Sequence, residues 1–469
     1  MYSDPEEIAR QGVNASNVYP NTFFLPESGI QRGSTISDPG DILSPGWPSI
    51  EGAYRLPKEE APKFLPKIPS QPIGYGDARK FLEVMGGPKA PEDWQGGLPG
   101  LTYRLGPGAD SKHQGWKVRI VTHNYLEDVK DSNVIGVIRG SVEPDRYVLL
   151  CNHRDAWGYG AIDPSSGTTA LMETARVLGN LHKTTGWRPR RTIVFASWAS
   201  EEYNLIGSTE WVNHHIQKIM ERAVALINID ICIIGDILSP KASPILKDVF
   251  VEAMKAVPST FDPSESYYKF LEGWLAKGND TKNTSVEDYV KLLGSGSDHH
   301  EFVFYAGVPG FYYWFFTDEQ KYSKGWYPAY HTGFETFYLM DKVLDPGFAL
   351  HKSCTQITMH MMLQLSESAL LPFATQHFVA AVKKGVASLE KEGKVKILRD
   401  AGLGKPYDVL LEAIEELAAA CSSWSKRKEE MVKSGELNDP IEARMLNDQI
   451  MKFERVWILP QVQIIISSI

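Results

Sequence analysis

From residue 132 to residue 234 the sequence alternates between short apolar runs and longer segments whose apolar side chains recur at helical spacing. The runs are rich in valine, isoleucine and leucine, as buried strands are. Strand-like runs cover residues 132–142, 145–153, 190–200 and 224–234, and helix-like segments cover residues 165–183 and 206–223. Because strands that alternate with helices form parallel sheets covered on both faces, this pattern predicts an α/β fold.

The sequence on either side of this region has a different character. Residues 1–100 are rich in proline and glycine, with one short helix-like stretch at residues 75–87. This composition indicates an irregular, turn-rich region that packs on another part of the protein. Residues 115–124 alternate in a strand-like way. Beyond residue 370 the spacing predicts amphipathic helices of a separate C-terminal region. Their apolar positions are Leu410, Ile414, Leu417, Cys421 and Trp424, then Leu446, Ile450, Phe453 and Trp457.

Composition excludes some classes of function. The net charge of -9 argues against a nucleic-acid-binding protein, which would carry a basic patch. No apolar run approaches the roughly 18–20 residues of a membrane span, and the N-terminus has no signal-peptide layout. The sequence as given therefore predicts no route into a membrane or a secretory compartment. Three glycosylation motifs begin at Asn14, Asn279 and Asn283.

The four cysteines lie far apart and match no spacing of a thiolate metal site. Two of them fall in apolar, strand-like runs, and free cysteine is among the residues most often buried in proteins. The sequence therefore predicts buried free thiols at Cys151, Cys232, Cys354 and Cys421.

Potential metal ligands stand where the strand-like runs end. In chain order they are His153, Asp163 at the start of a helix, Glu201, Glu202, Asp230 and, after a fourth apolar run, His331. Because sites in open α/β sheets form at the carboxyl ends of strands, these side chains should converge if the strands are adjacent. Two histidines with several carboxylates suit zinc, and a bridging carboxylate would let such a set hold two ions.

The same residues also have an ordinary structural explanation. A histidine or carboxylate at a strand end is most often a cap or a surface residue, and the Glu201–Glu202 pair alone would be a solvated turn. Spacing alone leaves a metal site and ordinary structure as open alternatives. The stretch GSGSD at residues 294–298 lacks the lysine of a phosphate-binding loop and indicates a loop beside a pocket. No Gly-x-Ser-x-Gly motif supports serine hydrolase chemistry.

Five motifs, in order, resemble a known family. They are HRDAWGYGAIDPSSG, GWRPRRTIVFASWASEEYNLIGSTEW, LINID, GSGSD and YPAYHTGFETF. They are similar to the glutamate carboxypeptidase II group, the N-acetylated-alpha-linked acidic dipeptidases and their dipeptidase-like, aminopeptidase-type relatives. The resemblance covers nearly the whole chain. It implies a zinc-exopeptidase fold: a mixed, mostly parallel sheet with helices on both faces.

The resemblance also implies a division of the chain and a partner. Residues 1–125 would be a remnant of a protease-associated domain with a connector, residues 126–368 a zinc peptidase domain, and residues 369–469 part of a helical dimerisation domain. The family form would be a homodimeric, single-pass type II membrane protein with an extracellular ectodomain. Measured against it, the chain is expected to be truncated at both ends and to lack the anchor.

The resemblance assigns a role to each candidate site residue. His153 and Asp230 would bind one zinc, Glu202 and His331 a second, and Asp163 would bridge the two ions. Glu201 would be the general base, Tyr330 would steady the developing oxyanion, and Asp155 would orient His153. Gly296 and Ser297 would lie at the substrate pocket. A structural calcium ion is partly matched by Glu210 with Ser44 and Trp47, but Asn213 replaces an expected glutamate, which predicts lower affinity.

One departure from the family bears on specificity. Phe311 and Tyr313 stand where the family is expected to carry arginines that attract an acidic substrate. Their loss predicts a small-peptide exopeptidase without a strong preference for an acidic penultimate residue. Two alternatives stay open: a truncated member that binds zinc without turnover, and a receptor-like binding protein, which the intact ligand set disfavours.

Overall fold

The structure, a computed structural model, describes the whole chain except residues 6–15, 37, 280, 321–325, 436–438 and 459–469. Its centre is a six-stranded sheet of order β1-β3-β2-β4-β6-β5. The strands are β1 (Val134–Ile138), β2 (Glu143–His153), β3 (Arg191–Trp198), β4 (Ala223–Asn228), β5 (Ile237–Ala242) and β6 (Gly310–Phe316).

The four central strands, β3, β2, β4 and β6, run parallel, and β1 and β5 pair antiparallel at the two edges. The mixed, mostly parallel sheet is therefore confirmed. The strand predicted at residues 115–124 is wrong, because this stretch, all of it described, is largely exposed and makes no ladder. Its alternating valine and isoleucine side chains lie in solvent rather than against a core.

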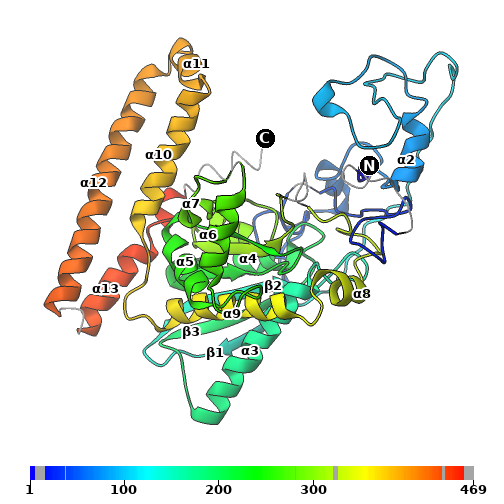
Figure 1. Cartoon of the computed structure of the whole chain (residues 1–469). Helices are drawn as coiled ribbons and strands as arrows, with labels where there is room; N and C mark the ends of the chain where they lie inside the picture. Colours follow the sequence, from blue (N-terminus) through cyan, green and yellow to red (C-terminus); the bar gives the residue numbers. More distant parts are fainter. Residues whose placement is uncertain (6–15, 37, 280, 321–325, 436–438, 459–469) are drawn as a thin grey trace.

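Helices cover both faces of the sheet (Figure 1). Val148 and Leu150 of β2 point into a large core shared with α3, α5 and α9, whereas Leu149 and Cys151 point into a second core with α4. The helices of the described residues are α2 (Tyr75–Leu82), α3 (Ser165–Thr185), α4 (Ile206–Arg222), α5 (Lys247–Ala256), α6 (Tyr267–Lys277), α7 (Val286–Tyr289), α8 (Phe337–Leu339), α9 (Ala349–Glu367), α10 (Thr375–Lys391), α11 (Lys394–Asp400), α12 (Gly404–Ser434) and α13 (Pro440–Met451).

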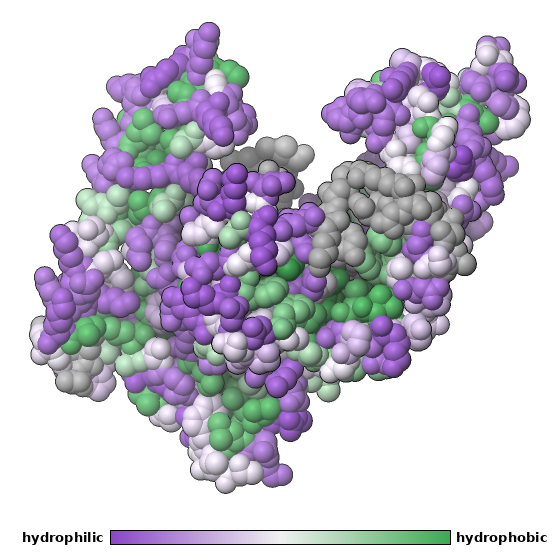
Figure 2. All heavy atoms as spheres, in the orientation of Figure 1, coloured by the Kyte–Doolittle hydropathy of each residue, from purple (hydrophilic) through white to green (hydrophobic). Residues whose placement is uncertain are grey.

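The C-terminal helices form an arm that projects from the sheet domain (Figure 1). Two ion pairs anchor its last helix, since Arg146 of β2 contacts Asp448 and Arg444 contacts Asp145. Figure 2 shows apolar atoms scattered among polar ones on the outer surface of this arm. No helix in the described part of the chain combines the length and the apolar character that crossing a membrane requires. The three-part division of the chain stays a prediction.

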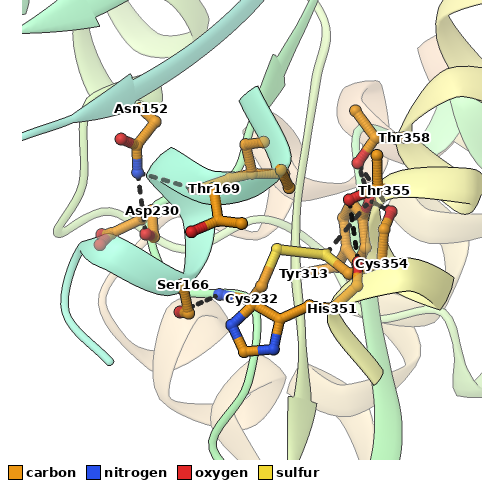
Figure 3. Close-up of a disulfide and its surroundings, with 12 residues drawn as sticks. Asn152, Ser166, Thr169, Asp230, Cys232, Tyr313, His351, Cys354, Thr355 and Thr358 are labelled. Atoms are coloured by element: carbon orange, nitrogen blue, oxygen red, sulfur yellow. Dashed lines mark hydrogen bonds between the residues drawn. A yellow bond between two sulfur atoms is a disulfide. The ribbon is translucent and has the colours of Figure 1, made fainter. Parts of the chain in front are cut away.

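A disulfide joins the segment after β4 to helix α9. Cys232 and Cys354 are bonded and fully buried, so the free thiols predicted for these two residues are wrong, whereas Cys151 and Cys421 are free and buried as predicted. The sequence hides this pairing because the two cysteines stand 122 positions apart. Figure 3 shows the disulfide in the same neighbourhood as Asp230, which stands two residues before Cys232.

We predict that Cys354→Ala lowers the free energy of unfolding by about 2–4 kcal/mol, because a cross-link that closes a long loop restricts the unfolded chain. Chemical denaturation with and without reductant measures the effect. The matched control is Cys421→Ala, which removes a buried thiol that is not cross-linked. Equal stability of the wild type in oxidising and reducing buffer would contradict the prediction.

Candidate metal centre

The parallel sheet brings the predicted ligands to one edge. His153 is the last residue of β2, Glu202 follows β3 and Asp230 follows β4. Asp163 lies just before α3, and His331 lies in the loop after β6. Because the four central strands point the same way, the segments that follow them meet above the same end of the sheet.

Asp163 lies between two imidazoles. Its Oδ1 is 3.2 Å from Nε2 of His153, and its Oδ2 is 3.2 Å from Nε2 of His331. Nε2 of His153 also lies 2.9 Å from Oδ1 of Asp230, and Nε2 of His331 lies 3.1 Å from Oε2 of Glu202. The five side chains therefore form two clusters that share Asp163.

Each cluster has the composition of a metal site. His153, Asp163 and Asp230 each offer a ligand atom within 4.8 Å of the others, and so do Asp163, Glu202 and His331. Oδ1 of Asp163 and Oε1 of Glu202 are buried without a hydrogen-bond donor. Buried carboxylate oxygens without donors are costly unless a cation neutralises them, and a set of imidazole nitrogens and carboxylate oxygens fits zinc.

The pKa values of the carboxylates in the cluster are shifted in opposite directions. Burial raises the pKa of Asp163, but the imidazoles of His153 and His331 beside it outweigh burial and hold this pKa at about 2. Burial, then the charge of Asp163, raises the pKa of Glu202 to about 9. Burial also raises the pKa of Glu201 well above its usual range. A bound cation would favour the carboxylate form of each of these groups.

Asp155 lies beside His153, where its predicted role requires it, and makes further contacts that were not predicted. Nδ1 of His153 lies 3.0 Å from the backbone oxygen of Asp155 but 3.7 Å from its carboxylate. The carboxylate instead accepts hydrogen bonds from the backbone N–H groups of Glu201, at 3.0 Å, and Glu202, at 3.1 Å. Asp155 therefore orients the imidazole through its main chain and fixes the two glutamates through its side chain.

His331 is held by groups that the sequence analysis missed. Its backbone lies in the left-handed region, with φ of 57°, and its Nδ1 lies 3.0 Å from the backbone oxygen of Arg32. The buried carboxylate of Glu335 accepts hydrogen bonds from the backbone N–H groups of His331 and Asp163. Glu335 lies in the YPAYHTGFETF motif, but its contacts are to main-chain groups, which no sequence spacing reveals.

Asp230 is also fixed by groups that were not predicted. The side-chain amide of Asn152 donates to the backbone oxygens of Ile229 and Asp230 at 2.9 and 3.0 Å. Figure 3 shows Asn152 beside Asp230. The hydroxyl of Tyr312 donates to Oδ2 of Asp230 at 3.3 Å.

Tyr330, predicted to steady the oxyanion, lies beside one of the ligands. Its ring stacks on the imidazole of His331, with 3.6 Å between centroids.

The assignment of Phe311 and Tyr313 to the substrate pocket is wrong. Both side chains are fully buried, their rings contact Phe250 of α5, and the hydroxyl of Tyr313 bonds Thr358 of α9. Side chains alternate along a strand, so the intervening Tyr312 faces the metal cluster instead. The absence of arginine at these two buried positions therefore says nothing about a preference for acidic substrates.

Of the two pocket residues predicted in the loop at residues 294–298, one is exposed and the other is buried. Gly296 is exposed, with φ of 98°, and nothing lies within 4 Å of where a Cβ would stand. Ser297 is buried, and its hydroxyl accepts a hydrogen bond from the side chain of Asn228 at 2.7 Å. Gly296 alone of the two is open to a ligand.

The calcium ion at Glu210, Ser44 and Trp47 stays a prediction. The carboxylate of Glu210 accepts hydrogen bonds from the backbone N–H groups of Asp41 and Ser49, and Arg55 pairs with Asp41. Calcium takes six to eight oxygen ligands, and these contacts already engage part of the carboxylate.

Comparison with known proteins shows a similarity to peptidases. Residues 133–345 match the model of Peptidase family M28. The chain is 38% identical over 467 residues to aminopeptidase NAALADL1 of Mus musculus, covering 98% of this chain and 61% of that protein. It is 35% identical over 475 residues to a glutamate carboxypeptidase 2 homolog of Caenorhabditis elegans, covering 98% of this chain and 60% of that protein.

The sheet, the two histidine–carboxylate clusters and the match of residues 133–345 agree with one class of protein, the zinc metallopeptidases of peptidase family M28. The chain is similar to the NAALADL1 aminopeptidases and the glutamate carboxypeptidase 2 homologs, as the five motifs predict. The chain spans about three fifths of the length of these relatives.

We predict that Asp155→Asn weakens zinc binding by about 10- to 100-fold, because the groups that orient metal ligands usually contribute that much. The amide keeps one acceptor oxygen but loses the second, so Glu201 and Glu202 are no longer both held. Competition with a chromophoric chelator measures the affinity. Asp93→Asn, at an exposed site, is the control and should bind zinc as the wild type does; unchanged affinity in Asp155→Asn would show that the carboxylate has no such role.

Proposed function

We propose that the chain is a zinc-dependent exopeptidase that hydrolyses small peptides with two metal ions bridged by Asp163. The observation that carries the proposal is the position of Asp163 between His153 and His331, with a further carboxylate beside each imidazole. Two-metal sites of this composition are a known hydrolytic device. Zinc ions held there would lower the pKa of an attacking water and polarise the scissile carbonyl.

Glu201 is the residue best placed to move the proton. It belongs to neither ligand cluster, yet its Oε2 lies 3.9 Å from Nε2 of His153 and its side chain is mostly buried. Its backbone is fixed by Asp155. From this position its carboxylate takes the proton of the attacking water and passes it to the leaving amine, as a general base and then a general acid.

Tyr330 is the candidate donor to the developing oxyanion. Burial raises the pKa of Tyr330 well above its usual range, so its hydroxyl keeps its proton and can donate a hydrogen bond. Stacking on His331 places the ring beside one ligand cluster.

The names of the relatives support the substrate class. One relative is called an aminopeptidase and others glutamate carboxypeptidase homologs, both of which denote removal of a terminal residue. A peptide with a free end next to the scissile bond is the substrate these names share. The homodimer and the extracellular placement that the resemblance implies stay proposals, as does glycosylation at the exposed Asn279 and Asn283; Asn14 lies outside the described residues.

We predict that Glu201→Gln keeps its zinc but lowers kcat/KM on a dipeptide panel by about 10²- to 10⁴-fold, the usual contribution of a general base. The zinc content by mass spectrometry and the rates are measured on the same samples. Glu173→Gln, which removes an exposed charge on α3, should match the wild type. A retained rate in Glu201→Gln would refute its role as the base.

The same samples separate the proposed function from its alternative. Zinc with peptide turnover in the wild type supports the exopeptidase. Zinc without turnover of any peptide in the panel supports a zinc-binding member of the family that does not catalyse hydrolysis. A wild type without zinc would favour a receptor-like protein.

A further inference from the structure

A lysine lies on the same face of the sheet as the metal cluster. Lys241 of β5 pairs with Tyr312 of β6 in the antiparallel ladder, so the two side chains point to the same side. Tyr312 is the residue whose hydroxyl contacts the metal ligand Asp230. One tyrosine side chain therefore separates Lys241 from the cluster.

Two aromatic rings hold the ammonium group of Lys241. Its Nζ lies 4.1 Å from the ring centroid of Trp314 and 5.6 Å from that of Tyr312. A cation over an aromatic face is stabilised by the ring electrons, and the effect grows as water is removed. Trp314 and Tyr312 are themselves buried and contact one another, with 4.6 Å between centroids, so the platform under the ammonium group is rigid.

Lys241 makes no ion pair with a carboxylate among the residues that the structure describes. It is partly buried, and burial followed by the charge of Lys291 lowers the pKa of Lys241. A partly desolvated cation that has aromatic partners but no anionic one gains most from a ligand that brings a carboxylate.

We infer that Lys241 is a specificity-determining residue that binds a carboxylate of the peptide substrate close to the scissile bond. The inference rests on the proposed function, because it places this carboxylate in the pocket beside the proposed metal centre. Lys241 supplies a cation near the metal centre, whereas Phe311 and Tyr313, at the positions of the expected arginines, are buried and uncharged. The carboxylate belongs either to an acidic side chain or to the free terminus of the peptide, and the chemistry of recognition is the same.

The test compares matched peptides in two variants. We expect Lys241→Met to lower kcat/KM by about 10- to 100-fold for the peptide that carries the recognised carboxylate, mainly through KM, because hydrogen bonds to charged groups contribute on that scale. Its rate on the neutral counterpart should change less than about 2-fold. Lys241→Arg, which keeps the cation, should retain most of the preference. Lys291→Met removes the neighbouring exposed charge and should leave the preference unchanged.

Two peptide pairs distinguish the source of the carboxylate. Glutamate against glutamine at each position tests a side-chain carboxylate, and a free C-terminus against its amide tests the terminal one. The pair that loses discrimination in Lys241→Met identifies the source. If the wild-type ratio survives in Lys241→Met for both pairs, the inference is overturned.

A binding measurement keeps the inference separate from the proposed function. Calorimetric titration of zinc-loaded Glu201→Gln, with and without Lys241→Met, compares affinities for the same peptides without turnover. Selective loss of affinity for the carboxylate-bearing peptide supports the role of Lys241 even if the wild type hydrolyses nothing. Equal binding of each matched pair by Glu201→Gln, or binding of none of the peptides, overturns it.

Discussion

The contact on which the site depends is the carboxylate of Asp163 placed between the imidazoles of His153 and His331. Each of its oxygens lies 3.2 Å from one Nε2 atom, so a single residue ties two ligand clusters into one centre. Both oxygens are needed for this geometry, and neither faces open water. A group in this position is stabilised only if positive charge lies on both sides of it.

The rest of the fold keeps that contact in place. The parallel strands β2 and β4 deliver His153 and Asp230, and the backbone N–H groups of Asp163 and His331 both donate to Glu335. One buried glutamate thus sets the distance between Asp163, the bridging residue, and His331, a ligand 168 positions later in the sequence. The disulfide between Cys232 and Cys354 links the segment that carries Asp230 to helix α9. Rigid support of this kind is what a metal centre needs for defined geometry.

Periodicity and motifs predicted the sheet and the convergence of its strand ends, because both follow from local sequence. The failures occurred where a role depends on tertiary contacts. The family resemblance predicts Phe311 and Tyr313 in the pocket, but the alternation of side chains along β6 directs Tyr312 toward Asp230 instead. The pairing of Cys232 with Cys354 and the two hydrogen bonds that Glu335 accepts from distant backbone groups leave no trace in local spacing. The strand expected at residues 115–124 has the right alternation but no neighbouring strand to pair with.

Anomalous X-ray diffraction at the zinc absorption edge, from crystals of the chain purified without chelator, tests the bridging role of Asp163 directly. We expect two peaks about 3.5–4 Å apart, the spacing of co-catalytic metal pairs, with Asp163 contacting both, His153 and Asp230 on one side, and Glu202 and His331 on the other. A zinc-replete crystal with no peak between these side chains, or with one peak that Asp163 does not touch, would contradict it.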